Sequence, residues 1–398
     1  MILTEIRINN LYCFDDFYVD FSYPRKVIES TIDYEFLEER PKFNIKRFCV
    51  IMGTNSSGKT ALGKVLFGIE NFIVRKELSD YLKTGISDNK KDASIEVKFV
   101  TTSDLKFHSL NLDFSSDSVF PIKALTYKAV PILQNDSCLS CKKRIDAVSQ
   151  DIRSKKYTYI SSVKDSIMNA YDAFSKIEFA SDSWDFRLGN NLDCHEDLCN
   201  KEYHPSRNLL ERIIKTYDQS VNNVTTITAS TKGTVEGYLV EFENGDTVRL
   251  NKRAEVFPED HARLSKGTSE ALNLVTFIAN ILKQGSDSCT YYLDDSLSST
   301  DSEIEKDLIN LMISKLKNSS QLFYTTHNNE FLTLNIPTHS FLFLSKKGNF
   351  VEAFQPEKMS FNKNDRTLFS YAKNNMFGTV PDTDGILEIL LNENFKLE

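Results

Sequence analysis

Apolar and polar residues alternate at the start of the chain, and this period of two predicts two antiparallel β-strands. The apolar members of the pattern are Ile2, Leu3, Ile6, Ile8, Phe14, Phe17, Val19 and Phe21. An unbroken apolar run at 49–52 predicts a buried strand. Residues 94–100 and 105–114 predict a β-hairpin, and residues 120–133 predict a further strand. The first third of the chain is therefore expected to be rich in antiparallel β-structure.

The middle of the chain changes to helical spacing. Apolar positions three and four apart occur in residues 144–154, 160–177 and 209–217. The polar stretch 182–206 between the last two segments shows little periodicity. Because no heptad pattern persists, the segment 136–220 is predicted to be an inserted helical subdomain and not a coiled coil.

Strands and helices alternate in the last third, which is typical of a mostly parallel sheet. The strands expected there lie at 290–293, 322–325 and 341–344, and the helices at 265–283 and 301–316. Before them, three strands are predicted at 224–227, 238–242 and 247–250, the last two joined by the turn signal Asn244-Gly245.

A two-lobed α/β protein follows from this order of elements. The chain has 398 residues, more than one ordinary core holds, because domains typically run ~100–200 residues. We divide it into an N-terminal lobe (1–135), the helical insertion (136–220), a C-terminal lobe (221–354) and a short helical tail (355–398).

The strand at 49–52 leads into Gly53-x-x-x-x-Gly58-Lys59-Thr60, the pattern of a phosphate-binding loop. Glycine lets backbone N–H groups approach an anion, Lys59 reaches the β- and γ-phosphates, and the Thr60 hydroxyl binds Mg²⁺. A chance match is the alternative, but the flanking strand and helix are the context that the motif requires. We expect ATP and Mg²⁺ as cofactors. The residues expected to hold them are Gly53, Asn55, Ser56, Ser57, Gly58, Lys59, Thr60 and Ala61.

The overall composition argues against some classes of protein. A net charge of −8 disfavours a protein that coats nucleic acid by bulk electrostatics, although a local basic face is compatible with it. No stretch approaches ~18 apolar residues, and the first residues lack the layout of a signal peptide. We therefore expect a cytoplasmic protein without a membrane partner.

Two adjacent acids, Asp294 and Asp295, end the predicted strand at 290–293. Consecutive strand residues point to opposite sides, so the two acids are not expected to share one task. We assign Asp294 to the Mg²⁺ that Thr60 also holds, and Asp295 to a water that attacks the γ-phosphate. A solvated strand end is the alternative interpretation.

Three further motifs follow in the second half of the chain. They are Leu264-Ser-Lys-Gly-Thr268, Ser298-Ser-Thr-Asp301 and Tyr324-Thr-Thr-His327-Asn328-Asn329. Each is short, and a lone histidine is more often structural than functional. Their order and spacing relative to the phosphate loop and the two acids make the set specific.

The set resembles the ABC-type ATPases of the SMC, RecF and OLD-nuclease group. In this resemblance, residues 264–268 correspond to the signature motif, residues 298–301 to the D-loop and His327 to the switch histidine. The resemblance covers residues 1–20, 47–70 and 260–345. Within the group it is nearest to the ATPase domains of the PrrC and RloC anticodon nucleases, and related ATPases occur in Septu (PtuA) anti-phage systems. It implies a two-lobed P-loop ATPase head with a mixed, mostly parallel core sheet, an antiparallel β subdomain and an inserted helical subdomain.

The resemblance also implies roles for single residues and a homodimer with two sandwiched ATP molecules. Ser265 and Gly267 would bind the γ-phosphate held by the opposite subunit, and His327 would sense it. A glutamine in such proteins touches Mg²⁺ and water, and Gln134 is the candidate here. Asp295 stands where the group has glutamate, so slow hydrolysis is expected; turnover well above ~1 per second would contradict it. With Lys59, the residues expected to act in catalysis are Asp295 and His327.

Four of the seven cysteines form two close pairs, Cys138 with Cys141 and Cys194 with Cys199. Two such pairs are typical of a tetrahedral zinc site. Small buried or incidental thiols are the alternative, because the second pair has an unusual spacing.

The segment 355–398 bears on what the ATPase is for. It contains no histidine, and Arg366 has Ser370 four positions on instead of a glutamate, so a ribonuclease module like that of the anticodon nucleases is not expected. We expect an ATP-driven sensor or regulatory subunit for a separate nuclease or toxin, in anti-phage defence. The alternatives are a DNA-structure-binding repair clamp and a self-contained nuclease whose site lies in the insertion.

Overall fold

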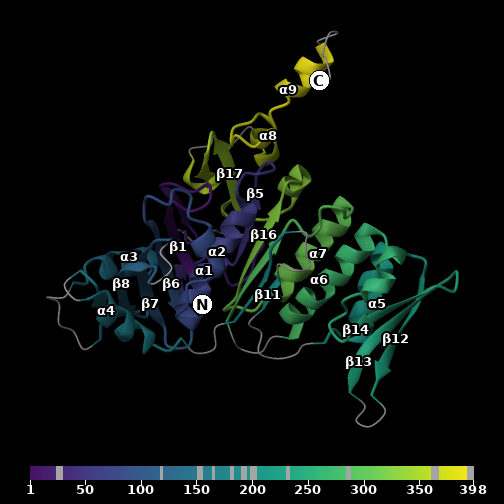
Figure 1. Cartoon of the computed structure of the whole chain (residues 1–398), viewed down its shortest axis with the longest axis horizontal. Helices are drawn as coiled ribbons and strands as arrows, with labels where there is room; N and C mark the ends of the chain where they lie inside the picture. Colours follow the sequence, from purple (N-terminus) through teal and green to yellow (C-terminus); the bar gives the residue numbers. More distant parts are fainter. Residues whose placement is uncertain are drawn as a thin grey trace.

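The computed structural model describes residues 1–23, 30–116, 120–149, 156–163, 166–179, 183–189, 195–197, 204–229, 234–283, 288–359 and 367–391. Their strands form two large sheets and two small ones, and helices pack on the faces of these sheets (Figure 1).

The first large sheet is antiparallel between all its neighbouring described strands, in the order β2-β1-β6-β7-β8-β9. Its strands are β1 (Ile2–Asn9), β2 (Phe17–Asp20), β6 (Ala93–Thr101), β7 (Lys106–Phe114), β8 (Ile122–Pro131) and β9 (Thr158–Ser161). Alternation places Ile6 and Ile8 of β1 in one buried cluster, and an irregularity in the pairing with β6 between Leu3 and Glu5 brings Leu3 into the same cluster.

The second large sheet has the order β11-β10-β15-β16-β5-β17-β18, with parallel pairing from β10 to β17 and antiparallel pairing at both edges. Its strands are β5 (Phe48–Met52), β10 (Ser183–Arg187), β11 (His195–Asp197), β15 (Cys289–Asp294), β16 (Gln321–Thr326), β17 (Phe341–Lys347) and β18 (Phe350–Phe354). Both faces are buried: Cys49 and Ile51 of β5 join one core cluster, and Val50 joins another. This explains why the strand is an unbroken apolar run.

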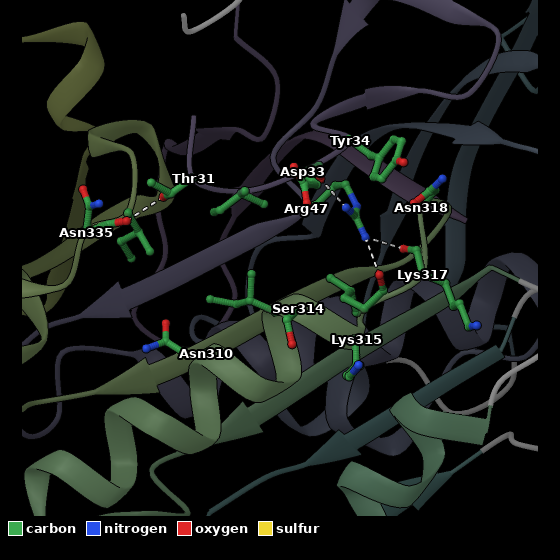
Figure 2. Close-up of a pocket in the computed structure, with 14 residues that line it drawn as sticks. Thr31, Asp33, Tyr34, Arg47, Asn310, Ser314, Lys315, Lys317, Asn318 and Asn335 are labelled. Atoms are coloured by element: carbon green, nitrogen blue, oxygen red, sulfur yellow. Dashed lines mark hydrogen bonds between the residues drawn. The ribbon is translucent and has the colours of Figure 1, made fainter. Parts of the chain in front are cut away.

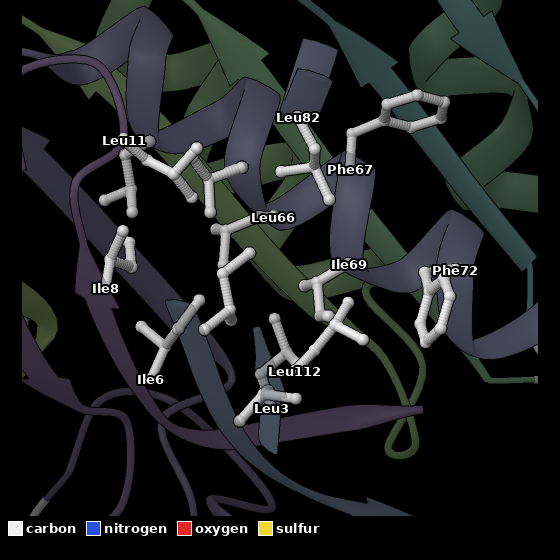
Figure 3. Close-up of a cluster of buried hydrophobic side chains, with 14 of the residues drawn as sticks. Leu3, Ile6, Ile8, Leu11, Leu66, Phe67, Ile69, Phe72, Leu82 and Leu112 are labelled. Atoms are coloured by element: carbon white, nitrogen blue, oxygen red, sulfur yellow. The ribbon is translucent and has the colours of Figure 1, made fainter. Parts of the chain in front are cut away.

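Helix α1 (Lys59–Arg75) lies between the two large sheets. Leu66 and Ile69 on this helix face Leu3 and Ile6 of β1 in a shared apolar core (Figure 3). The helix that begins at the predicted phosphate loop is therefore fixed by packing along most of its length.

The remaining elements complete the layers. The other helices are α2 (Asp80–Thr84), α3 (Cys138–Asp146), α4 (Ile167–Ser175), α5 (Arg207–Tyr217), α6 (Lys266–Lys283), α7 (Ser302–Lys315), α8 (Leu368–Lys373) and α9 (Asp384–Leu391). The small sheets are β12 (Val221–Thr228), β13 (Val235–Phe242) and β14 (Thr247–Asn251), and β3 (Phe36–Leu37) with β4 (Arg40–Asn44). Short 3₁₀ turns lie at Pro258–Arg263, Asn329–Thr333, Thr338–Ser340 and Pro356–Lys358.

The predicted fold class is confirmed: the protein is a mixed α/β protein with a mostly parallel core sheet and a separate antiparallel sheet. One part of the predicted helical insertion needs correction. Residues 183–187 form β10, which pairs in parallel with β15 and buries Trp184 and Phe186. Residues 158–161 are likewise a strand, β9, rather than the start of a helix. Both strands are too short for their periodicity to stand out, and pairing with neighbours decides their conformation.

Candidate functional site

The predicted site residues converge at one edge of the parallel sheet. The phosphate loop follows β5, Asp294 ends β15, and His327 follows β16, which lies between these two strands. Because the three strands are parallel, their carboxyl ends meet at the same edge, where open α/β sheets bind ligands.

The loop from Gly53 to Gly58 has the backbone of an anion-binding turn. Ser56 and Gly58 have positive φ angles of 62° and 93°, and helix α1 begins immediately afterwards. A side chain at Gly53 would have its Cβ 2.3 Å from Ser57 Oγ and 2.6 Å from Leu344 O, so only glycine fits.

Lys59 lies inside this loop with 8% of its surface exposed. Its ammonium donates to the carbonyl oxygens of Gly53 (2.8 Å) and Thr54 (3.0 Å). Burial lowers the pKa of Lys59, and the negative charges of Asp295 and Asp294 oppose this shift. A cation held between a glycine-containing turn and the start of a helix makes a strong anion site.

Ser57 adds an unsatisfied group to the same loop. Its hydroxyl is buried and has no hydrogen-bond partner among the residues that the structure describes. Asn55 and Ser56 are exposed, and Ala61 is half-buried in the first turn of α1. A buried polar atom without a partner is rare, and it fits a loop that closes around an oxygen-rich ligand.

Asp294 is the most enclosed acid of the site, with 1% exposure. Its carboxylate accepts hydrogen bonds from Thr60 Oγ1 (2.5 Å), Thr325 Oγ1 (2.6 Å) and the Gly189 N–H (3.0 Å). The hydroxyl of Thr60 and this carboxylate are oxygen ligands of the kind that Mg²⁺ prefers. The pair therefore fits the predicted metal role.

Asp295 lies just beyond the end of β15. It has a φ of 47°, and its backbone N–H donates to Thr325 Oγ1 at 2.9 Å. Its carboxylate lies 3.1 Å from Nδ1 of His327, and the two side chains are 30% and 50% exposed. The structure therefore pairs the two residues that were predicted to act on water and on the γ-phosphate.

A cavity of 390 Å³ opens between His327 and the start of the phosphate loop. Its lining consists of Met52, Gly53, Thr54, Asn55, His327, Asn329, Thr379, Pro381 and Asp382. The last three belong to the tail, which sequence analysis did not connect with the site. The ring of Phe377 stacks on that of Phe343 of β17 with 3.9 Å between the ring centroids. Ser345 Oγ donates a hydrogen bond to Gly378 O at 3.0 Å. No local signal predicts these contacts, because the partners are far apart in the chain.

Ser265 and Gly267 lie elsewhere, at the start of helix α6. Ser265 is exposed, and its hydroxyl caps the helix by accepting from the Thr268 N–H at 3.1 Å. The nearest neighbour of a Cβ built on Gly267 is Ser299 O, at 3.6 Å, in the loop before α7. The structure thus places the predicted signature beside the predicted D-loop and not beside the phosphate loop of the same chain.

Gln134 is wrongly predicted as an Mg²⁺ ligand. It is exposed in the loop after β8, and the register of the sheet puts Val130 of β8 level with Ile2 at the start of β1. Cys13, whose sulfur adjoins Gly58, follows the other end of β1. The eight residues of β1 span ~25 Å, so Gln134 lies far from the loop. Gly189 after β10, which sequence analysis missed, reaches Asp294 instead.

The predicted zinc ligands are only partly described. Cys194 and Cys199 lie outside the described residues. Cys138 and Cys141 are buried on α3, and burial raises the pKa of their thiols to about 11 and about 12. Within the described residues, no group of three or more histidines, cysteines or acids is placed to hold a metal ion.

A second cavity, of 440 Å³, lies beside the C-terminal end of α7, next to Arg47 and residues 31–34 (Figure 2). There Arg47 donates to Asp33 O and to the carbonyl oxygens of Leu316 (2.8 Å) and Lys317 (2.6 Å), just after the end of α7. Burial lowers the pKa of Arg47 to about 10. Its hydrogen bonds are those of a structural tie that ends a helix and anchors the segment before β3.

Comparisons with known proteins give matches among solved structures. No family model matches the sequence, and no curated protein sequence matches it. The solved structure of an SMC head bound to the C-terminal winged-helix domain of ScpA is similar, with 12% identity, a TM-score of 0.46, and 91% of this chain and 99% of that chain covered. An SMC head domain from Thermotoga maritima is similar with 12% identity, a TM-score of 0.39, and 89% and 99% covered. Among the described helices, none is both long and apolar enough to cross a membrane.

Proposed function

We propose that the protein is an ABC-type ATPase that binds ATP with Mg²⁺ and hydrolyses the β–γ bond slowly. One observation carries the proposal: Thr60 of the phosphate loop donates a hydrogen bond to Asp294, which lies 234 positions away. Two sequence patterns, each proposed to supply half of a metal–phosphate site, are in direct contact in the folded chain. Chance matches give no reason for this contact.

Thr60 and Asp294 are the residues that would hold the metal ion. When bound, Mg²⁺ supplies charge neutralisation at the β- and γ-phosphate oxygens. Lys59 contributes its positive charge to the same oxygens, and the N–H groups of the loop donate hydrogen bonds to them. Thr325 and Gly189 keep Asp294 in position through the two other bonds to its carboxylate.

Asp295 and His327 serve the chemical step. A water oxygen forms a bond to the γ-phosphorus while the bond from that phosphorus to the bridging oxygen breaks, which yields ADP and inorganic phosphate. Asp295 accepts the proton of the water. His327 holds the Asp295 carboxylate through Nδ1 and presents its other nitrogen to the γ-phosphate. The short side chain of Asp295 positions water less well than a glutamate, which makes turnover slow.

The site is completed by a second copy of the chain. Ser265 and Gly267 are solvent-accessible at the N-terminus of α6, and the positive end of that helix favours a phosphate. A second copy that docks this surface over the phosphate loop would supply what the loop lacks. Two chains then enclose two ATP molecules.

The direct test of this proposal is sedimentation of an Asp295→Asn variant, which binds ATP and hydrolyses it little. We expect a monomer without nucleotide and a dimer with ATP and Mg²⁺. An unchanged mass with saturating ATP, bound as shown by equilibrium dialysis, would contradict the dimer. Failure to bind ATP at all would contradict the ATPase.

We extend the proposal to a regulatory role in which the dimer controls a separate effector, a nuclease or toxin of an anti-phage system, as in PrrC- and PtuA-like proteins. Support comes from helix α9, which projects from the body and exposes Ile386 (63%), Leu387 (47%) and Ile389 (50%) (Figure 1). Co-purification with the products of adjacent genes tests this role. DNA-stimulated ATPase activity without a partner would favour a repair clamp instead.

A further inference from the structure

Glu305 on helix α7 is a buried acid that the proposed mechanism leaves unused. It is 3% exposed, and its carboxylate accepts hydrogen bonds from Tyr324 OH (2.5 Å), Thr326 Oγ1 (3.1 Å) and Asn328 Nδ2 (2.9 Å). These three partners are neutral, and no ion pair to Glu305 occurs among the described residues. A carboxylate buried among neutral donors costs more desolvation than an apolar side chain would, so packing alone does not account for it.

Two of the three partners of Glu305 flank His327 in the chain. Thr326 and Asn328 lie directly before and after it, and Asn328 Nδ2 also donates to Ser302 Oγ at 3.0 Å. The backbone that carries His327 is therefore held on both sides from helix α7. Because strand residues alternate, Thr325 points the opposite way and bonds to Asp294 and to the Asp295 N–H. The end of β16 thus contacts the nucleotide site on one face and α7 on the other.

Helix α7 leads from this network toward residues 264–268, which we call the signature surface. Ser302 begins the helix directly after the predicted D-loop, 298–301. In that loop the Ser299 N–H donates to Glu270 of α6 at 3.1 Å, and Ser299 O is the nearest neighbour of a Cβ built on Gly267. A continuous series of contacts therefore joins His327 to the start of α6.

We infer that Glu305 is a positioning residue that couples the nucleotide site to the signature surface of the same subunit. The inference rests on the proposed ATPase function and adds a regulatory link to it. When the γ-phosphate draws His327 into contact, Thr326 and Asn328 move with it, and Glu305 and Ser302 transmit that displacement to residues 298–301. The surface that meets the second copy then depends on whether nucleotide is bound.

A hydrogen-bond swap tests the link. In Glu305→Gln an amide donor faces the Asn328 amide donor, and in Asn328→Asp two carboxylates face each other. In the double variant the two groups are exchanged. The amide N–H at position 305 can donate to the carboxylate at position 328, and the amide oxygen at position 305 still accepts from Tyr324 and Thr326. Glu303→Gln is the matched control, because Glu303 lies on the same helix with its side chain 80% exposed.

We expect each single variant to keep its ATP affinity within about 3-fold, because Lys59, Thr60 and Asp294 are unchanged. We expect kcat and ATP-dependent dimerisation to fall about 10-fold or more, and the double variant to recover most of both. A double variant as impaired as the single variants, or equal losses in affinity, kcat and thermal stability, would assign Glu305 a merely structural role. Single variants with wild-type kcat and dimerisation would overturn the inference while leaving the ATPase intact. A wild-type protein without ATPase activity would overturn both.

Discussion

The two ends of the proposed site differ in how complete they are within one chain. Asp294 is 1% exposed and accepts hydrogen bonds from three donors that come from three different segments. Ser265 is exposed and bonds to Thr268 in the first turn of its own helix. Folding therefore assembles the metal–phosphate end, whereas the signature end stands ready on the surface. Binding of nucleotide and formation of the full site are separable events in such a protein.

Lys59→Ala should give the largest effect, because it removes the only side-chain cation proposed to contact the phosphates. We expect ATP affinity to fall on the order of 100-fold, with hydrolysis and dimerisation lost as a consequence. Titration with a fluorescent ATP analogue measures the affinity. Lys83→Ala, at a half-exposed lysine on α2, is the control. Wild-type affinity in Lys59→Ala would place the nucleotide elsewhere.

Ser265→Arg should impair the signature end of the site and leave the metal–phosphate end intact. We expect ATP affinity within about 3-fold of wild type, and hydrolysis reduced at least about 100-fold because the second copy can no longer close the site. Colorimetric phosphate release measures the activity. Mixing this variant with Lys59→Ala should restore part of the activity, because one of the two composite sites then has both residues. No recovery on mixing, with both variants folded, would argue that each chain hydrolyses ATP alone.

Asp295→Glu should give the smallest effect, and in the opposite direction. The longer side chain brings its carboxylate nearer to the attacking water, so we expect kcat to rise by roughly 10-fold with affinity unchanged. Steady-state kinetics at saturating ATP measures it. A slower enzyme would mean that the 3.1 Å contact with His327 already holds Asp295 in its best position.

Much of the site was predictable because its residue types are dictated by local chemistry. A glycine loop before a helix and acids after an apolar strand have few other uses, and the structure brings Thr60 and Asp294 together. The prediction for Gln134 was wrong because it rested on the order of motifs along the chain. That order does not show that Gln134 and the phosphate loop lie near opposite ends of β1. Gly189 contributes a backbone N–H, which every residue except proline has, so its residue type gives no signal. The tail residues at the cavity depend on the stacking of Phe377 on Phe343, a contact that no periodicity encodes.

The burial of Glu305 could not be predicted from the sequence either, because it also depends on tertiary contacts. In the sequence it is one acid in an amphipathic helix that also carries the exposed Glu303. Only the tertiary arrangement shows that the face carrying Glu305 meets the end of β16. Long-range polar contacts of this kind follow from topology and not from spacing.

The position of β5 has a consequence for how the protein is made. This strand pairs with β16 and β17 and with no other described strand, and both are synthesised long after it. At ~5–20 residues per second, the apolar strand waits on the order of tens of seconds for its neighbours. During that time the emerging chain carries an unpaired aggregation-prone segment and a phosphate loop without Asp294. A nascent chain that ends before β15 lacks Asp294 and cannot form the metal–phosphate end of the site. Nucleotide with Mg²⁺ would therefore bind well only to chains whose synthesis has passed that strand.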